Sequence, residues 1–249
     1  MRKKYTIIGD GKLARHFCHY FKLLNIQFNQ WSRKLSNKNK LTLNDVIFDS
    51  DACLILIKDS EIEKFIQSNK VLENKLLVHF SGSLVIDIAL GFHCPMTFAQ
   101  ELYSLEKYEK IPFMIEANSS YYKVDKDEVF HEIFPELNNP YFFIPKEEKA
   151  YYHSLCVMAG NFTSILWNKI FSEFEERFSV PAEMAHCYLD SITKNLKENY
   201  KQALTGPFER NDKATIEKNL KALEGDDCKP IYNAFLNYYM NKHNRDKIK

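Results

Sequence analysis

The chain has 249 residues, 45% of them hydrophobic and 14% aromatic, which indicates a globular protein of one or two domains. Its formal net charge of +1 gives no electrostatic case for binding nucleic acid or an anionic membrane, because both need a basic face. Apolar runs are too short for a membrane span, and the six cysteines form no C-x-x-C pair, so we expect a cytoplasmic protein without a metal centre or a disulfide framework.

A glycine pair follows the first predicted strand, residues 5–8, in the sequence G-D-G-K-L-A. This is the G-x-G-x-x-A form of the dinucleotide-binding fingerprint. The first glycine makes a tight turn, the second lets the backbone approach a pyrophosphate, and the alanine lets helix and strand pack closely. The helix that follows presents unpaired N–H groups to the phosphates. We therefore predict a dinucleotide site at Gly9, Gly11, Lys12, Leu13 and Ala14.

Up to about residue 117, short apolar runs alternate with helical or polar stretches, which is typical of βαβ units on a parallel sheet. We predict strands at 5–8, 26–31, 52–57, 76–80 and 112–116, with a further short one near 90–92. Between 34 and 50 we predict only a short strand and a turn of helix. The stretch 118–145 is polar and punctuated by prolines, and we interpret it as an irregular extension of the sheet.

After Pro145 the apolar residues recur at helical spacing and no proline interrupts them before Pro181, which predicts one helix of about 30 residues. Further helices are predicted at 181–203, 212–223 and 230–243, with Asp212 as an N-cap. The predicted fold is α/β: a Rossmann-like, mostly parallel sheet with helices on both faces, followed by an all-helical domain. We place the dinucleotide-binding domain at 1–145 and a substrate and dimerisation domain at 146–249.

The end of the second strand favours NADP over NAD. An NAD site usually carries an acidic residue about 20 positions after the glycines, but no Asp or Glu occurs between Asp10 and Asp45. Ser32 and Arg33 stand there instead, and a guanidinium suits a 2′-phosphate. The alternative is that the basic residues of this stretch form a solvated loop without cofactor preference.

Candidate chemical groups lie after two strands and on the long helix. His79 and Ser81 follow one predicted strand and are expected at the cofactor, while His93, after the next strand, is a candidate general acid. On the long helix, Asn161 and His153 are candidates to face the same cleft. For His79, His93 and Asn161 a structural hydrogen bond is the alternative role, and for His153 the alternative is a partly exposed position on the helix.

One later residue also suits substrate binding. Arg210 precedes the helix that Asp212 caps, and a cleft arginine suits a substrate carboxylate. A surface salt bridge is the alternative role for this side chain.

Six segments along nearly the whole chain resemble a family of predicted NADP-dependent oxidoreductases that join a Rossmann-like domain to a helical domain of unknown function. They are IGDGKLA (8–14), WSR (31–33), IKDSEI (57–62), HFSG (79–82), HCPMTF (93–98) and LTGPFERND (204–212). The resemblance implies a relationship to the pyrroline-5-carboxylate reductase, ketopantoate reductase and 6-phosphogluconate dehydrogenase group. It also implies that the helical domain forms a homodimer and closes the nicotinamide cleft, and that Lys58 and Asp59 lie at the cofactor edge. Thr205, in the last of these segments, is a candidate substrate contact together with Arg210.

Two departures qualify what the resemblance implies. Lys58 stands where such proteins usually have a proline, and if Asn161 matches the Asn of the Lys-x-x-x-Asn motif of related dehydrogenases, Val157 replaces the lysine. Valine cannot transfer a proton. The sequence therefore leaves two hypotheses: an NADPH-dependent oxidoreductase acting on a small, anionic carbonyl or imine substrate, or a non-catalytic NADP-binding sensor or structural protein.

Overall fold

The computed structural model describes residues 3–117 and 128–247, with side chains up to residue 241. The chain forms two compact units, Met1–Ile165 and Leu166–Lys249, and passes from one to the other within helix α8 (Thr163–Glu176). The limit at 145/146 that we drew from the sequence marks the change from mixed to helical structure. As a domain boundary it stays a prediction.

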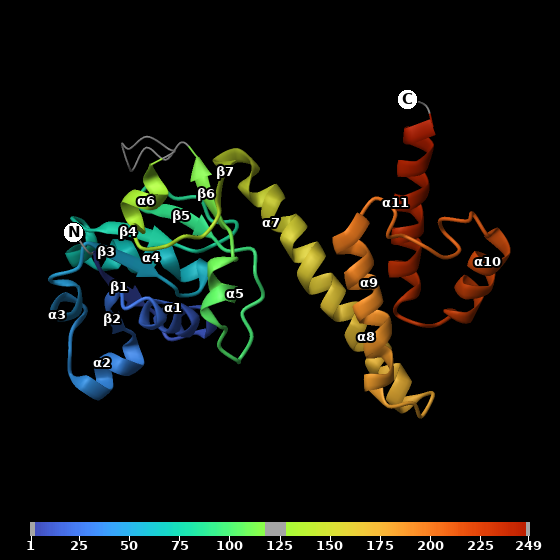
Figure 1. Ribbon diagram of the computed structural model, residues 1–249, viewed down its shortest axis with the longest axis horizontal. Helices are drawn as coiled ribbons and strands as arrows, with labels where there is room; N and C mark the ends of the chain where they lie inside the picture. Colours follow the sequence, from blue (N-terminus) through green and yellow to red (C-terminus); the bar gives the residue numbers. More distant parts are fainter. Residues whose placement is uncertain (1–2, 118–127, 248–249) are drawn as a thin grey trace. The chain divides into compact units, whose positions relative to one another are not determined.

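A seven-stranded sheet forms the centre of the first unit, in the order β2-β1-β3-β4-β5-β6-β7 (Figure 1). Its strands are β1 (Lys4–Ile8), β2 (Gln27–Trp31), β3 (Ala52–Ile55), β4 (Leu76–His79), β5 (Leu90–His93), β6 (Phe113–Ala117) and β7 (Tyr141–Pro145). The first five strands are mutually parallel, whereas β6 runs antiparallel to β5 and parallel to β7. The carboxyl ends of β1 to β5 therefore meet at one edge of the sheet.

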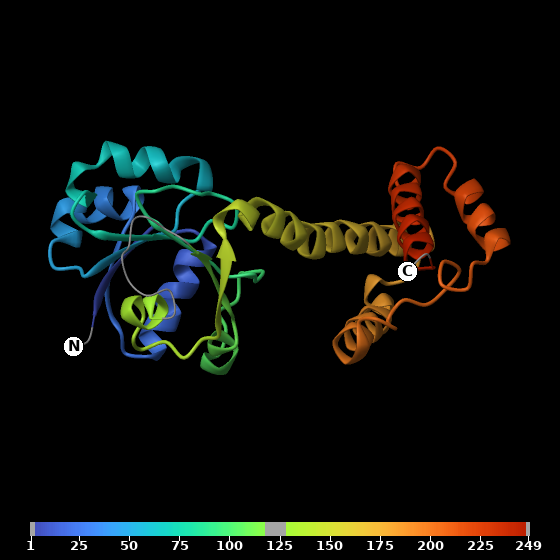
Figure 2. The same ribbon diagram turned by 90° about the horizontal axis from the view of Figure 1, so that it is seen from above.

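Helices cover both faces of this sheet (Figure 2). They are α1 (Lys12–Leu23), α2 (Arg33–Asn39), α3 (Leu43–Ile47), α4 (Asp59–Ser68), α5 (Leu105–Glu109) and α6 (Val129–Ile133), with short 3-10 turns η1 (Lys70–Leu72) and η2 (Lys146–Glu148). Successive strand residues alternate between the faces. Leu54 packs in the cluster that contains α1 and α6, whereas its neighbours Cys53 and Ile55 pack in the cluster that contains α3 and α4.

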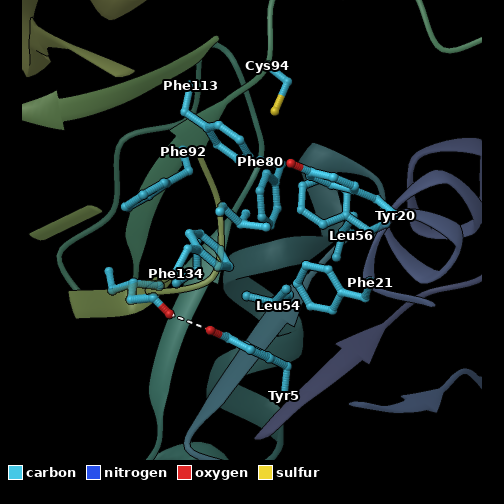
Figure 3. Close-up of a cluster of buried hydrophobic side chains, with 14 of the residues drawn as sticks. Tyr5, Tyr20, Phe21, Leu54, Leu56, Phe80, Phe92, Cys94, Phe113 and Phe134 are labelled. Carbon is cyan, nitrogen blue, oxygen red and sulfur yellow. Dashed lines mark hydrogen bonds between the residues drawn. The ribbon is translucent and has the colours of Figure 1, made fainter. Parts of the chain in front are cut away.

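Aromatic side chains fill the larger of the two core clusters (Figure 3). The ring of Tyr5 lies 5.1 Å from that of Phe21 and 5.7 Å from that of Phe134. The hydroxyl of Tyr5 donates to the carbonyl oxygen of Ile133 at 2.7 Å, so this buried phenol keeps a hydrogen-bond partner. The first strand is thereby joined to α6, far away in the sequence.

The long helix predicted after Pro145 is confirmed, but it changes its winding midway. Helix α7 (Lys149–Val157) is followed by a π-helical turn, η3 (Met158–Phe162), and then by α8. The remaining elements are η4 (Ala182–Ala185), α9 (His186–Asn199), α10 (Lys213–Ala222) and α11 (Lys229–Lys247). The described part of the second unit is therefore all-helical, as predicted.

The second unit is held together by a few polar and aromatic contacts. Lys169 on α8 contacts Asp226 at 3.1 Å, and the ring of Trp167 lies 5.8 Å from that of Tyr188 on α9. Asp212 caps α10 as predicted, because its carboxylate accepts from the backbone N–H of Thr215 at 3.1 Å.

Three of the predictions for secondary structure are wrong. The stretch 34–50 forms α2 and α3 rather than a short strand, because Ser32 and Thr42 cap two separate helices. The stretch 118–145, interpreted as irregular, contains helix α6 and the regular strand β7, whose pairing with β6 involves a partner far away in the sequence, while its residues 118–127 lie outside the described part of the chain. Helix α9 ends at Asn199, four positions before the predicted end.

Candidate functional site at the carboxyl edge of the sheet

The turn between β1 and α1 has the geometry that its two glycines predict. Gly9 has a φ of +138°, and a Cβ there would lie 2.2 Å from the carbonyl oxygen of Leu56, so no other residue fits. A Cβ on Gly11 would meet no atom within 4 Å. Gly11 is the N-cap of α1 and provides no side chain to bond the N–H groups of the first turn. The turn therefore leaves open space at a helix N-terminus, as a pyrophosphate requires.

The end of β2 carries a contact that sequence reasoning missed. The Ser32 side chain is buried, donates to the carboxylate of Asp10 at 3.0 Å, and accepts from the backbone N–H of Leu35 at 3.2 Å. Arg33 is exposed. An acidic group thus reaches the end of β2 from the glycine turn itself, although the sequence between that turn and residue 45 contains none. Of the predicted pair, the arginine is exposed and the serine is buried.

The loops after β3 and β4 are joined by a short hydrogen bond. Lys58 is the exposed N-cap of α4, and Asp59 begins that helix. The hydroxyl of Ser81 donates to the carboxylate of Asp59 at 2.5 Å and accepts from the backbone N–H of Leu84 at 3.0 Å. The structure therefore brings together two of the predicted cofactor residues.

His79, at the end of β4, is fully buried. Burial and the nearby charge of Lys149 lower its pKa to about 3, so the imidazole is neutral at pH 7. Its Nδ1 accepts from the backbone N–H of Ser81 at 3.3 Å, which places the proton on Nε2. That Nε2 has no hydrogen-bond partner among the described residues.

His93, at the end of β5, meets two side chains of α7. Its Nδ1 lies 2.7 Å from the hydroxyl oxygen of Tyr152, and its ring lies 5.7 Å from that of His153. Burial, followed by the neighbouring His153 and Lys149, lowers the pKa of His93 to about 4. Burial also raises the pKa of Tyr152 well above its usual range. The pair at this position is therefore a neutral imidazole and a neutral phenol.

Gly82 completes this group from the loop after β4. A Cβ on Gly82 would lie 2.2 Å from Cδ2 of His153, so the loop and α7 are in tight contact. The residues on the carboxyl edge now form a continuous row: Gly9 touches Leu56, Asp59 bonds Ser81, Gly82 touches His153, and His93 bonds Tyr152.

Sequence reasoning also missed a buried ion pair beside this row. Lys149 contacts Glu116 at 2.8 Å, with side-chain exposures of 3% and 4%. Burial lowers the pKa of Lys149, and the bond to Glu116 opposes that shift. No sequence signal could have found the pair, because both residues read as ordinary surface positions, one at the end of a strand and one in the first turn of a helix.

The face of α7 that packs on the sheet edge of its own unit is polar. Lys149, Tyr152, His153 and Cys156 are buried or half-buried and follow the i, i+3, i+4, i+7 spacing of one helix face. The apolar residues that predicted the helix lie on its other side: Tyr151 is 64% exposed, Leu155 46% and Met158 52%. A helix face of Lys, Tyr, His and Cys against a sheet edge is typical of a chemical site rather than of a core.

Three further predicted residues are exposed. Asn161 lies within the π-helical turn, a feature that is frequent at functional sites. Thr205 and Arg210 lie in the second unit, where the backbone N–H of Arg210 donates to Gly206 at 3.2 Å. Their roles stay predictions. In the part of the chain that the structure describes, no group of three metal-ligating side chains gathers, and no helix has the length and apolar character to cross a membrane.

A family model described as a domain of unknown function (DUF2520) matches residues 111–238, just over half of the chain. The chain belongs to this family. The match to DUF2520 begins just before the strand β6 and ends within α11. No match is found among curated proteins.

Solved structures share the fold of this DUF2520 chain. A candidate NADP oxidoreductase of Bacteroides fragilis is 23% identical with a TM-score of 0.74, covering 95% of this chain and 97% of its own. A protein of Thermotoga maritima is 21% identical with a TM-score of 0.71, and the match covers 98% of this chain and 99% of that protein. The pyrroline carboxylate reductase of Plasmodium falciparum, solved with NADP bound, is 16% identical with a TM-score of 0.59, covering 96% of each chain. These likenesses confirm the Rossmann-like fold with a helical C-terminal domain.

Proposed function

We propose that this protein is an NADPH-dependent oxidoreductase that transfers a hydride to the carbonyl or imine carbon of a small, anionic substrate. The observation that carries the proposal is the continuous row on the carboxyl edge of the sheet, from the open glycine turn to the His93–Tyr152 pair. In open α/β sheets this edge is where ligands bind. A row with a phosphate-binding turn at one end and proton-bearing side chains at the other suits a dinucleotide and its substrate.

The residues present fit NADP. Gly9 and Gly11 give the pyrophosphate a close approach to the N-terminus of α1, and the exposed Arg33 offers a guanidinium to the 2′-phosphate. Lys58, Asp59 and Ser81 lie along the edge between the two ends of the row. The bound cofactor would supply the hydride. The fold shared with a reductase solved with NADP supports this choice.

The His93–Tyr152 pair is suited to the proton half of the reaction. Two protons are shared between a neutral imidazole and a neutral phenol, and only one of them lies in the hydrogen bond that joins them. If Nδ1 carries the imidazole proton, it donates to Tyr152, and the O–H of Tyr152 is left to donate to the substrate. If Nε2 carries the proton, Tyr152 donates to Nδ1, and the N–H at Nε2 is left to donate to the substrate. Such a neutral donor polarises a carbonyl and matches the strongly basic oxygen that hydride transfer creates. Tyr152 thereby provides a proton donor where Val157 cannot.

The test separates catalysis from binding alone. Calorimetry with NADPH measures the binding that both hypotheses share, and absence of binding would defeat both. The absorbance of NADPH is then followed with a panel of keto acids, cyclic imines and aldehydes. Turnover that His93→Ala and Tyr152→Phe abolish supports the oxidoreductase, while Tyr151→Phe, an exposed neighbour, is the matched control. Asn161→Ala tests the role of the π-helical turn in the same assay.

The alternative function is an NADP-binding sensor or structural protein. The observation that favours it is Val157 at the position where related dehydrogenases have lysine. This alternative function predicts NADPH binding without turnover of any substrate in the panel.

A homodimer is part of the proposal. Large apolar side chains are exposed on the second unit: Phe178 (61%), Tyr188 (61%), Tyr200 (72%), Phe235 (49%) and Tyr238 (65%). Burying such side chains against a second copy would remove apolar area from water. Light scattering at micromolar concentration should give the mass of a dimer, and the mass of a monomer would contradict it.

A further inference from the structure

The ion pair between Lys149 and Glu116 is enclosed by three elements of the first unit. Glu116 comes from β6, and the ammonium of Lys149, in the first turn of α7, donates to it at 2.8 Å. The same ammonium donates to the carbonyl oxygen of Leu84, in the loop after β4, at 2.5 Å. One side chain therefore ties the beginning of α7 to a strand and to a loop that also carries Gly82.

The backbone of β5 makes room for the pair. Gly91 lies opposite the ion pair, and a Cβ there would be 2.4 Å from Nζ of Lys149 and 2.9 Å from Oε2 of Glu116. Gly91 has no positive φ that would call for glycine. The small residue at this strand position is therefore explained by the space that the ion pair takes.

We infer that the buried Lys149–Glu116 pair is a positioning element of the site, which fixes the first turn of α7 so that Tyr152 and His153 are held against His93 and Gly82. This inference rests on the proposed function for its effect on turnover. Tyr152 and His153 follow Lys149 by three and four residues, so they lie on the same face of the helix, one turn away. An anchor at Lys149 therefore sets both the height and the rotation of the two side chains over the end of β5.

Stability alone does not account for such a pair. Two charges that leave water lose much of their hydration, and well-packed apolar residues of similar volume are often as stabilising in their place. The two hydrogen bonds of Lys149, by contrast, fix a direction, because an ammonium needs acceptors at defined positions. The charge of Lys149 also acts on the site, because it contributes to the lowered pKa of both His79 and His93.

The test replaces the pair by apolar residues of similar size, Lys149→Met with Glu116→Leu. The readout is the ¹⁵N NMR signal of His93, which reports the hydrogen bond at Nδ1 whether or not the protein turns over a substrate. We expect the double variant to fold and to bind NADPH within about twofold of wild type. It should lose the ¹⁵N signal of the hydrogen bond at Nδ1 of His93, which we call the His93 signature. It should also lower kcat by about tenfold or more, because small misplacements near reacting groups have large effects. The matched control is Lys146→Met, which removes the more exposed Lys146–Asp87 contact at the same end of the helix.

Each outcome decides the inference. A folded double variant with the wild-type His93 signal and the wild-type kcat would overturn it. If the double variant does not fold, Gly91→Ala, which pushes the pair apart without removing either charge, should produce the same loss of the His93 signature, and an unchanged signature would overturn the inference. If the wild type shows no turnover at all, the proposed function has failed, and the NMR signal alone decides the positioning role.

Discussion

Gly82 and His153 are in such close contact that a Cβ on Gly82 would lie 2.2 Å from Cδ2 of the imidazole. The loop after β4 and the first turns of α7 are thus held at a fixed separation. The same imidazole lies 5.7 Å, ring to ring, from His93 at the end of β5. Any side chain added at Gly82 therefore displaces the group that packs on the candidate proton donor.

Gly82→Ala should move His153 and weaken both stability and turnover. Insertion of a methyl group into a packed contact costs about 1–3 kcal/mol, which urea unfolding measures. The control is Gly160→Ala, since a Cβ there meets no atom within 4 Å. Equal effects of the two substitutions would show that the contact with His153 has no particular importance.

The two glycines of the first turn should respond differently to alanine. Gly9→Ala adds a clash with Leu56 and a strained φ, so we expect a loss of stability of about 3 kcal/mol or more. Gly11→Ala has open space and an extended backbone with φ of −71°, so the fold should persist. Its methyl group would occupy the approach of the pyrophosphate, and calorimetry should show NADPH binding weakened by about tenfold or more, equivalent to about 1.4 kcal/mol. Unchanged binding in the folded Gly11→Ala variant would argue against a dinucleotide at this turn.

Charge at the end of β2 should set the cofactor preference. Arg33→Asp should weaken the binding of NADPH by about 10- to 100-fold, because a charge-assisted contact to the 2′-phosphate contributes about 1.5–3 kcal/mol, and it should leave NADH nearly unchanged. Asp10→Asn should instead raise the preference for NADPH over NADH, since it removes the negative charge of the carboxylate that Ser32 bonds at the end of β2. Calorimetry with both cofactors measures the ratio of the dissociation constants of NADPH and NADH. Equal losses for NADPH and NADH in the Arg33 variant would contradict the choice of NADP.

Acid should destabilise the first unit through two histidines whose pKa is lowered in the folded protein, His79 and His93. The pKa of His93 is about 4 and that of His79 about 3 in the folded protein, both below the ordinary value of 6.5. Below pH 6.5 the unfolded chain therefore binds more protons than the folded one, and the stability falls as the pH falls, by up to about 1.4 kcal/mol per pH unit for each histidine. This loss continues until the pH reaches the folded pKa.

His93→Gln isolates one histidine in this pH dependence. Between pH 7.5 and pH 5.0, wild type should lose about 1–2 kcal/mol more unfolding free energy than the variant, with part of the effect screened by solvent. Urea unfolding at the two pH values measures the difference. An identical loss in both proteins would mean that His93 is not held neutral by burial, His153 and Lys149.

Much of the fold follows from local patterns in the sequence. The strands β1 to β6 were predicted because buried parallel strands read as short apolar runs, and α7 to α8 because apolar residues recur at helical spacing. β7 was missed since its pairing with β6 depends on a partner far away in the sequence. The stretch 34–50 was misread because its two capping residues, Ser32 and Thr42, were not recognised as helix starts.

The site was only partly predictable for the same reason. The glycine turn could be named from its fingerprint, and Asp59 from the family resemblance. Ser81 and His93 could be named because residues that follow parallel strands share one edge of the sheet. Tyr152, Lys149 and Glu116 could not, because the apolar pattern that located the helix points to its other face, and the partners of these side chains lie 33 to 65 residues away.

The sequence by itself determined that a tight glycine turn follows the first strand, because Gly9 and Gly11 stand at fingerprint spacing directly after a short apolar run. Outside 34–50 and β7, it also determined most of the succession of strands and helices, because hydrophobic periodicity is a local property of the chain. Only the tertiary structure decided which face of α7 meets the sheet and which side chains meet on it. Helix orientation is set by the burial of Lys149 on Glu116 and by the space at Gly82 and Gly91, and such contacts exist only once distant segments have packed together.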